Sequence, residues 1–121
     1  MIKHRKTNMK FLETLNGSFI NFNEISVIKH DLDKEMRFYY SHIHLRDGTI
    51  YDLLDIYETF IDKDGSEIKL EYEHVLILHE IACNIIGEQY SAGVLLWKEL
   101  DKKVWKEFTE TWKTRVEERK Q

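Results

Sequence analysis

The stretch from Val94 to the C-terminus most constrains this fold, because its pattern is that of one long helix in a chain of only 121 residues. It carries all three tryptophans, Trp97, Trp105 and Trp112. At about 1.5 Å per residue, roughly 27 residues span about 40 Å, which exceeds the width of about 30 Å of a small compact domain. We therefore expect part of the aromatic face to extend past the core, where a second copy of the chain would cover it.

The length of the chain predicts a single domain, residues 1–121, with enough apolar residues for a modest core. Its one cysteine, Cys83, excludes an intramolecular disulfide and favours a reducing compartment. The basic start leads into no apolar segment of the kind that a signal peptide or a membrane span requires. We therefore expect a cytoplasmic protein without a membrane partner, in which residues 1–8 form a frayed basic head.

Charge is distributed unevenly along the chain, although the net charge is only −4. Between Asp47 and Glu80, ten acidic residues face only two basic ones, Lys63 and Lys69, whereas both ends of the chain lean basic. An acidic middle repels nucleic acid, and a basic surface that could follow a phosphate backbone is difficult to build outside the first few residues. We therefore expect no nucleic-acid partner.

The first half of the chain has the turn residues of an antiparallel sheet. The dipeptides Asn16-Gly17 and Asp47-Gly48 each separate two apolar runs, and both favour two-residue hairpin turns. Residues Asn23–Ile28 either extend the second strand or form a short turn. The four strands that this pattern predicts are Lys10–Leu15, Ser18–Phe22, Met36–Leu45 and Thr49–Leu54.

The second half predicts helices. Over Asp55–Tyr72 the pattern is ambiguous, with helical spacing first and strand alternation later, so we expect only a loop or hairpin around Asp62–Gly65. Over Glu73–Gly87 apolar residues return at helical spacing, and Ser91 is a suitable cap for the last helix. The predicted fold class is α+β, with an N-terminal four-stranded antiparallel sheet followed by two C-terminal helices, the last one long and oligomer-forming.

No metal site or catalytic group stands out. His42 and His44 lie on one strand face without a third ligand at a diagnostic spacing. Residues 60–71 resemble a calcium loop but begin with phenylalanine where such a loop needs a carboxylate. Cys83 lies among apolar residues, where a thiol is more often buried than activated. The run His79–Cys83 resembles a zinc-protease helix but lacks its second histidine. We expect no catalytic residue, no metal and no cofactor, and hence a protein that is not an enzyme.

Asn84 is one candidate for ligand binding. It follows Ile77 and Ile81 at helical spacing, so we expect its amide on the buried face of the first helix, where a polar group needs a partner. It is either a satisfied core amide or part of a ligand pocket between the helices, and the residues leave both interpretations open.

The last helix supplies the other candidates, because aromatic and basic residues recur along it at spacings of three and four. They are Trp105, Phe108, Trp112, Arg115 and Arg119. Aromatic rings stack on nucleobases, and guanidinium groups bind phosphate oxygens in pairs. Such a stripe therefore suits a ligand with a base and phosphates. It equally suits core or oligomer contacts, with cations that complement the helix dipole.

The layout of four antiparallel strands and two helices, with Arg115 and Arg119 four residues apart near the C-terminus, resembles the first described family of phage Thoeris anti-defence proteins. In architecture the resemblance covers most of the chain. Members of that family bind glyco-cyclic ADP-ribose, made by bacterial TIR enzymes, without cleaving it. Their pockets lie where helices of two protomers meet, and they can form hexamers that also hold cyclic oligonucleotides.

The resemblance implies that this protein is a sponge for signalling nucleotides in the host bacterial cytoplasm, where it blocks Thoeris immunity. Arg115 and Arg119 would bind the phosphates of the ligand. The protein would form a homo-oligomer, a dimer or a hexamer, and would lower the free concentration of the signal by mass action alone.

Two other functions remain open. An acidic phage inhibitor would bind a host nucleic-acid-processing protein through the acidic middle of the chain, used as a mimic of nucleic acid. A purely structural oligomer would bind neither a nucleotide nor a host protein.

Overall fold

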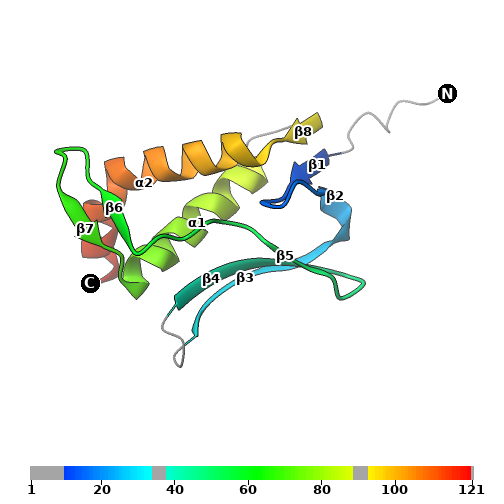
Figure 1. Cartoon of the computed structure of the whole chain (residues 1–121), viewed down its shortest axis with the longest axis horizontal. Helices are drawn as coiled ribbons and strands as arrows, with labels where there is room; N and C mark the ends of the chain where they lie inside the picture. Colours follow the sequence, from blue (N-terminus) through cyan, green and yellow to red (C-terminus); the bar gives the residue numbers. More distant parts are fainter. Residues whose placement is uncertain (1–9, 34–37, 89–92, 121) are drawn as a thin grey trace.

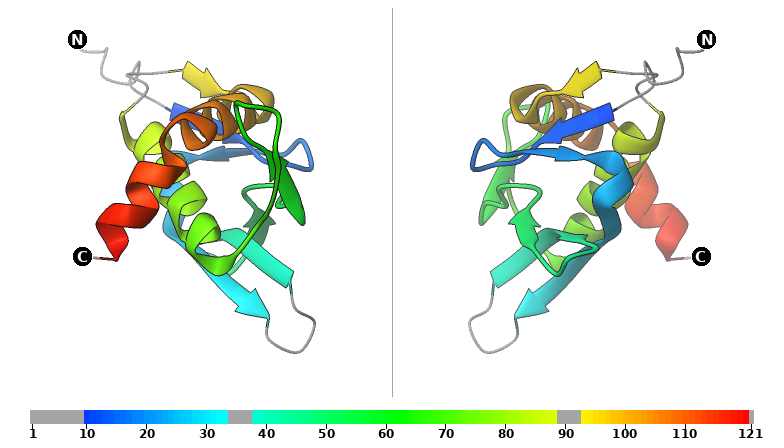
Figure 2. Two further views of the ribbon diagram at one scale, coloured as in Figure 1. Left: turned by 90° about the vertical axis from the view of Figure 1, so that its left-hand side faces the viewer. Right: turned by 90° about the vertical axis from the view of Figure 1, so that its right-hand side faces the viewer.

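The computed structural model describes residues 10–33, 38–88 and 93–120. Within this part of the chain the fold is α+β, as predicted, with two helices, α1 (Tyr72–Glu88) and α2 (Trp97–Arg119), and three small sheets. α1 lies between α2 on one side and the β3–β4 hairpin on the other (Figures 1 and 2). The predicted basic head lies outside the described residues.

The first sheet is three-stranded and mixed. Its central strand, β1 (Lys10–Glu13), pairs antiparallel with β2 (Phe19–Asn21) and parallel with β8 (Gly93–Leu95), which precedes α2. Leu12, in the middle strand, is fully buried. The prediction of one four-stranded antiparallel sheet is therefore wrong, because the third strand here comes from residues that were assigned to the linker and the last helix.

The second sheet is antiparallel, with the order β3-β4-β5. β3 (Ile25–Asp33) and β4 (Phe38–Leu45) form a long hairpin, and β5 (Ile50–Asp52) is the opposite edge strand. The pair Ile28 and Ile43 faces α1, and Ile43 is fully buried. This hairpin covers the side of α1 that faces away from α2.

The chain passes from the first sheet to the second at Asn21. The side-chain oxygen of this residue accepts a hydrogen bond from the backbone N–H of Asn23 at 2.9 Å, which turns the chain into a short 3-10 helix, η2 (Phe22–Glu24). Of the two alternatives predicted for Asn23–Ile28, the short turn is therefore confirmed for Asn23 and Glu24, and β3 begins at Ile25. A local side-chain hydrogen bond thus divides the predicted sheet into two.

The two predicted hairpins are confirmed, but their loops have three residues and not two. The backbone N–H of Thr14 donates to the Ser18 carbonyl, and that of Leu45 donates to the Thr49 carbonyl, so residues 15–17 and 46–48 form the loops. Gly17 and Gly48, with φ angles of 88° and 94°, occupy the left-handed last position of each loop. A third hairpin, β6 (Thr59–Ile61) and β7 (Glu67–Lys69), turns around Gly65, with φ of 90°. The ambiguous middle of the chain is therefore an extended segment that ends in a hairpin.

α2 begins at Trp97 and not at the predicted Val94. Gly93 adopts φ of 105° and Val94 pairs in β8, so the residues before Trp97 are extended. The predicted cap, Ser91, lies outside the described residues, and a carboxylate distant in sequence caps the helix instead. Glu13 Oε1 accepts a hydrogen bond from the Trp97 backbone N–H at 3.0 Å, which satisfies one of the free donors at the helix start.

The core lies where α1 meets α2, the two larger sheets and the segment before β6. Among the described residues, no helix combines the length and the apolar composition needed to cross a membrane. The large side chains that are almost fully buried are Leu12, Ile43, Leu53, Val75, Ile77, Leu78, Ile81, Leu100, Val104 and Phe108.

Candidate ligand-binding site

Arg115 is held by acidic groups from both helices. Its Nη1 donates to Glu80 Oε1 of α1 at 2.9 Å, and its Nη2 donates to Glu107 Oε2 of α2 at 3.0 Å. Its Nε donates to Thr111 Oγ1, one turn earlier on α2, at 3.2 Å. All three guanidinium nitrogens are therefore occupied, and the group is fixed with its side chain only 25% exposed.

Arg119 joins the same network through Glu80. Its Nη1 lies 3.7 Å from Glu80 Oε2, so one carboxylate lies between the guanidinium groups of Arg115 and Arg119. The predicted arginine pair is thus brought together in space. The sequence did not identify Glu80, Glu107 and Thr111 as its partners, although the spacings of four and eight from Arg115 place the last two on its helix face.

Trp112 is turned away from the arginines. Its Nε1 donates to Asp62 Oδ1 at 3.1 Å, and the other oxygen of Asp62 lies 3.1 Å from the ammonium group of Lys113. The indole packs edge-to-face on the rings of Phe60 and His74, at centroid distances of 5.4 and 5.2 Å. Trp112 therefore holds the β6–β7 hairpin on α2. Its indole is not a free stacking surface next to Arg115.

Asp62 is adapted to this role. The hydrogen bond from Trp112 lowers the pKa of its carboxyl, and the backbone N–H of Lys63 and the Lys113 ammonium act in the same direction, while burial opposes them. The carboxylate is only 4% exposed. The residue that resembled part of a calcium loop is therefore an anchor of the hairpin in this structure.

The other two tryptophans also contact the segment between β5 and α1. Trp105 lies 6.0 Å from the Tyr57 ring and 5.6 Å from the Phe108 ring, measured between centroids. Trp97 Nε1 donates to the Leu53 carbonyl at 3.1 Å. The aromatic face that was expected to need a second copy of the chain is thus covered to a large extent by residues 53–70 of the same chain.

Asn84 is exposed, so the prediction that it shares the buried face of α1 is wrong. The buried arc of α1 is centred on Leu78 and Ile85, and at about 100° per residue Asn84 lies just beyond the edge of that arc. His74, in contrast, is buried, and its Nδ1 accepts a hydrogen bond from the backbone N–H of Glu71 at 2.9 Å. Asn84 therefore lines no space between the helices.

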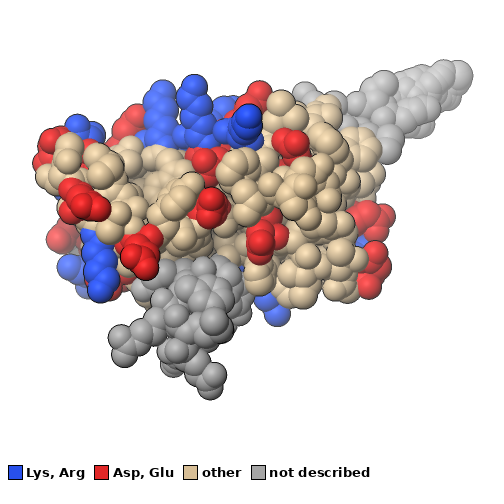
Figure 3. All heavy atoms as spheres, viewed as in Figure 1, with Lys and Arg blue, Asp and Glu red and all other residues tan. Residues whose placement is uncertain are grey.

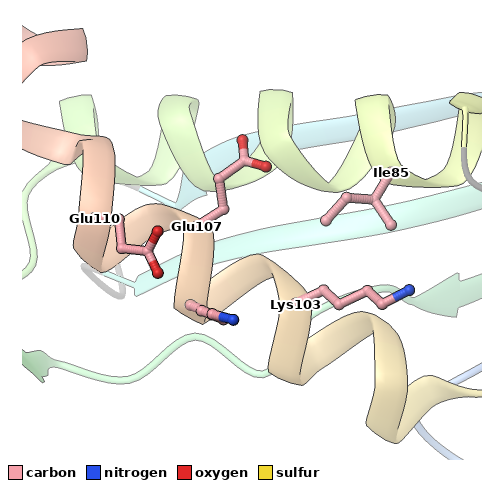
Figure 4. Close-up of a pocket in the computed structure, with 5 residues that line it drawn as sticks. Ile85, Lys103, Glu107 and Glu110 are labelled. Atoms are coloured by element: carbon pink, nitrogen blue, oxygen red, sulfur yellow. The ribbon is translucent and has the colours of Figure 1, made fainter.

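A shallow depression of about 320 Å³ lies between α1 and α2 (Figure 4). It is lined by Ile85 from α1 and by Lys103, Lys106, Glu107 and Glu110 from α2. Of these lining residues, Glu107 alone belongs to the arginine network. The two lysines and the two glutamates of the lining balance in charge. None of the predicted ligand residues lines this depression.

A histidine pair between β3 and α1 is the other polar cluster. The rings of His30 and His79 lie 4.1 Å apart, and Cys83 Sγ lies 3.5 Å from His79 Nε2. Burial, together with nearby His30, lowers the pKa of His79 to about 4, and burial raises the pKa of the Cys83 thiol. Within the described ranges, no three His, Cys, Asp or Glu side chains are grouped to hold a metal ion.

Comparison of the chain with protein-family models, curated proteins and solved structures gave no match. The functional interpretation therefore depends on the geometry of the described residues.

Proposed function

We propose that the protein binds and sequesters a signalling nucleotide without cleaving it, as a phage anti-defence sponge that blocks Thoeris immunity. The ligand would be glyco-cyclic ADP-ribose or a cyclic oligonucleotide. The observation that carries the proposal is the carboxylate of Glu80, which lies between the guanidinium groups of Arg115 and Arg119. An oxyanion already occupies the place where the proposal puts a phosphate.

Exchange of this carboxylate for a phosphate is physically reasonable. Glu80 is 49% exposed, and ion pairs at exposed sites contribute only about 0–1 kcal/mol, so its displacement costs little. A phosphate offers more acceptor oxygens, and guanidinium groups bind it in a bidentate manner. Thr111 holds Arg115 in place through its Nε, which leaves both terminal nitrogens available once the carboxylates move.

The aromatic residues have a supporting role in this proposal. Trp112 and Trp105 fix the helix that presents the arginines, and the hairpin and Tyr57 already cover them. Stacking on the base would then come from a second copy of the chain, in a dimer or hexamer. The proposal therefore requires that ligand binding and self-association depend on each other.

Calorimetry on the purified protein tests the proposal, with glyco-cyclic ADP-ribose and a set of cyclic dinucleotides and trinucleotides as probes. We expect submicromolar binding at one ligand per protomer or per few protomers, and recovery of the unaltered ligand after heating. A converted product would make the protein an enzyme. The variant R115A/R119A should lose binding, whereas R46A/K69A, which removes two exposed charges elsewhere, should keep it.

The variant Glu80→Gln gives a sharper test, because it has opposite consequences for a ligand site and for a structural ion pair. If the arginines bind phosphate, removal of the competing carboxylate should tighten ligand binding several-fold. If the network only connects α1 to α2, the substitution should leave ligand binding unchanged. Weaker binding would show that Glu80 itself contacts the ligand, and the displacement argument would then fail.

A second candidate is an acidic inhibitor that binds a basic, nucleic-acid-processing host protein. Exposed carboxylates around the β6–β7 hairpin favour it, among them Glu58, Asp64 and Glu67. Asp62 does not contribute, because it is buried against Trp112. Salt-sensitive capture of a basic host protein that E58Q/D64N/E67Q abolishes would support this candidate over the sponge.

A further inference from the structure

A row of lysines runs along the solvent-facing side of α2. Lys98, Lys102 and Lys106 follow one another at spacings of four, Lys113 continues the row, and all four are exposed. Figure 3 shows basic side chains gathered along the top of the molecule, over α2. Lys98, Lys102 and Lys106 follow one another at about 6 Å along the helix axis, and Lys113 lies about 10 Å beyond Lys106. Charge counted by stretch of chain, and not by helix face, does not reveal this row.

The first three lysines of the row are not neutralised by a salt bridge within the described part of the chain. Lys113 pairs with Asp62, but Lys98, Lys102 and Lys106 form no salt bridge among the described residues. Like charges four residues apart on a helix repel each other and destabilise it. Two such pairs in succession indicate a surface whose charge suits a partner outside the chain.

The width of the row restricts that partner. At about 100° per residue, Glu99 and Glu110 lie along one side of the lysines, and Asp101 lies along the other. A flat anionic membrane or a broad acidic protein surface would bring these carboxylates against like charges. A single line of anions contacts the lysines and avoids the flanking acids.

An exposed aromatic ring lies next to the row. Trp105 follows Lys102 by three residues and therefore neighbours it on the helix surface. The ring of Tyr57, with the residue 53% exposed, packs against Trp105 at 6.0 Å. Asp55 and Asp101 lie near its hydroxyl and, together with burial, raise the pKa of Tyr57, so this place suits an uncharged base and not a phosphate. Such a ring beside a line of cations provides a stacking surface for a base whose phosphates follow the lysines.

We propose that the row Lys98, Lys102 and Lys106, with Tyr57 beside it, binds single-stranded nucleic acid. The lysines contact consecutive phosphates of one strand, and Tyr57 stacks on a base. This interaction does not use the Arg115 network and is independent of the proposed sponge function. It also replaces the expectation, drawn from the acidic middle of the chain, that nucleic acid is not a partner.

Fluorescence anisotropy with labelled dT12 at low salt tests the proposal. We expect measurable binding whose logarithm falls with the logarithm of the salt concentration at a slope of about −2, as for about three phosphate contacts on a single strand. The triple variant K98Q/K102Q/K106Q should weaken binding at least tenfold and flatten the slope.

The matched control is K29Q/K63Q/K69Q, which removes three exposed lysines that lie outside α2 and changes the net charge equally. It should bind dT12 within about twofold of the wild type. The variant Tyr57→Ala should weaken dT12 binding about five- to tenfold but leave binding of inorganic polyphosphate unchanged, because polyphosphate has no base to stack.

Several results would overturn the proposal. One is the absence of dT12 binding by the wild type at low salt, and another is equal loss of binding in the triple variant and its control. Binding of duplex DNA as tight as that of dT12 would exclude a single-strand site. Binding only to vesicles that contain anionic lipid would assign the row to a membrane surface.

Discussion

The aromatic face of α2, formed by its three tryptophans and Phe108, and its arginine end, formed by Arg115 and Arg119, contact the rest of the chain through different kinds of groups. Trp97, Trp105 and Trp112 each contact residues 53–70, through a carbonyl, a ring and a buried carboxylate respectively. The arginine side chains contact the rest of the chain through the carboxylate of Glu80, which is itself 49% exposed. One region of the helix is therefore part of the core, and the other is bound by groups that water or a ligand can replace.

This difference indicates where a ligand can bind. An indole whose N–H is hydrogen-bonded inside the chain, as in Trp97 and Trp112, must break that contact to bind a ligand, whereas an exposed ion pair can exchange its anion at small cost. The stripe of aromatic and basic residues that looked like one site in the sequence thus divides into a structural part and an exchangeable part.

The largest effect should come from Phe108, at the centre of the aromatic face. Its side chain is fully buried and packs edge-to-face on Phe60 at 4.8 Å. Phe108→Ala should lower the free energy of unfolding by about 3–5 kcal/mol, measured by urea denaturation, because it leaves a cavity between α2 and the hairpin. Thr114→Ala, at an exposed position of the same helix, should change it by less than about 0.5 kcal/mol. Similar losses in both variants would contradict a buried aromatic face.

A smaller effect should follow from acid, because α1 carries a half-buried histidine, His79, next to the exposed Glu80. Burial, with nearby His30, lowers the pKa of His79 to about 4, whereas the unfolded chain has the ordinary value of about 6.5. Between these values the unfolded state binds a proton that the folded state does not, so stability falls as the pH drops from 6.5 to 4. The total loss should be about 3 kcal/mol.

Urea denaturation at several values between pH 7.5 and 4.5 measures this loss. His79→Gln should flatten the pH dependence, and the slope that remains should come in part from His74, whose pKa is also lowered by burial. A His79→Gln protein with the wild-type pH dependence would show that His79 is not buried as described.

The next effect concerns the attachment of the hairpin to the aromatic face. Asp62→Ala removes the acceptor of the Trp112 indole and the partner of Lys113. We expect Tm to fall by a few degrees and the tryptophan emission to shift to the red, since the hairpin loosens and water reaches Trp112. Lys63→Ala, an exposed side chain in the same turn, should change neither signal. An unchanged emission spectrum in Asp62→Ala would mean that Phe60 and His74 hold the hairpin without the carboxylate.

Local signals in the sequence predicted much of this fold. The Asn16-Gly17 and Asp47-Gly48 turns, the α+β class and the two helices follow from turn chemistry and apolar spacing, and the structure has them. The parallel pairing of β1 with β8 was not predictable in this way, because it joins segments about eighty residues apart and leaves no periodic trace in either.

The errors at the candidate site have two causes. The last helix was judged too long for the core of so small a domain, and a second copy of the chain was invoked to cover its aromatic face. In the structure residues 55–72, which had no clear pattern in the sequence, lie on the helix, with Tyr57 and Asp62 as its contacts. Asn84 was misplaced because a helix wheel gives the spacing of a buried arc but does not fix its centre, which depends on the packed neighbours.

The smallest effect on stability, and the most informative one for function, should come from Arg115. Its guanidinium contacts two carboxylates that are 49% and 42% exposed, so water can solvate both when the arginine is removed. Arg115→Ala should therefore lower the free energy of unfolding by no more than about 1 kcal/mol. The same variant should abolish nucleotide binding if the arginine end is the ligand site.

Arg115→Lys separates charge from geometry, because an ammonium group keeps the charge but cannot contact a phosphate in a bidentate manner. A folded Arg115→Lys protein with weakened binding would place the recognition in the guanidinium fork. A loss of stability in Arg115→Ala as large as that in Phe108→Ala would show instead that both regions of α2 belong to the core, and the division between them would be wrong.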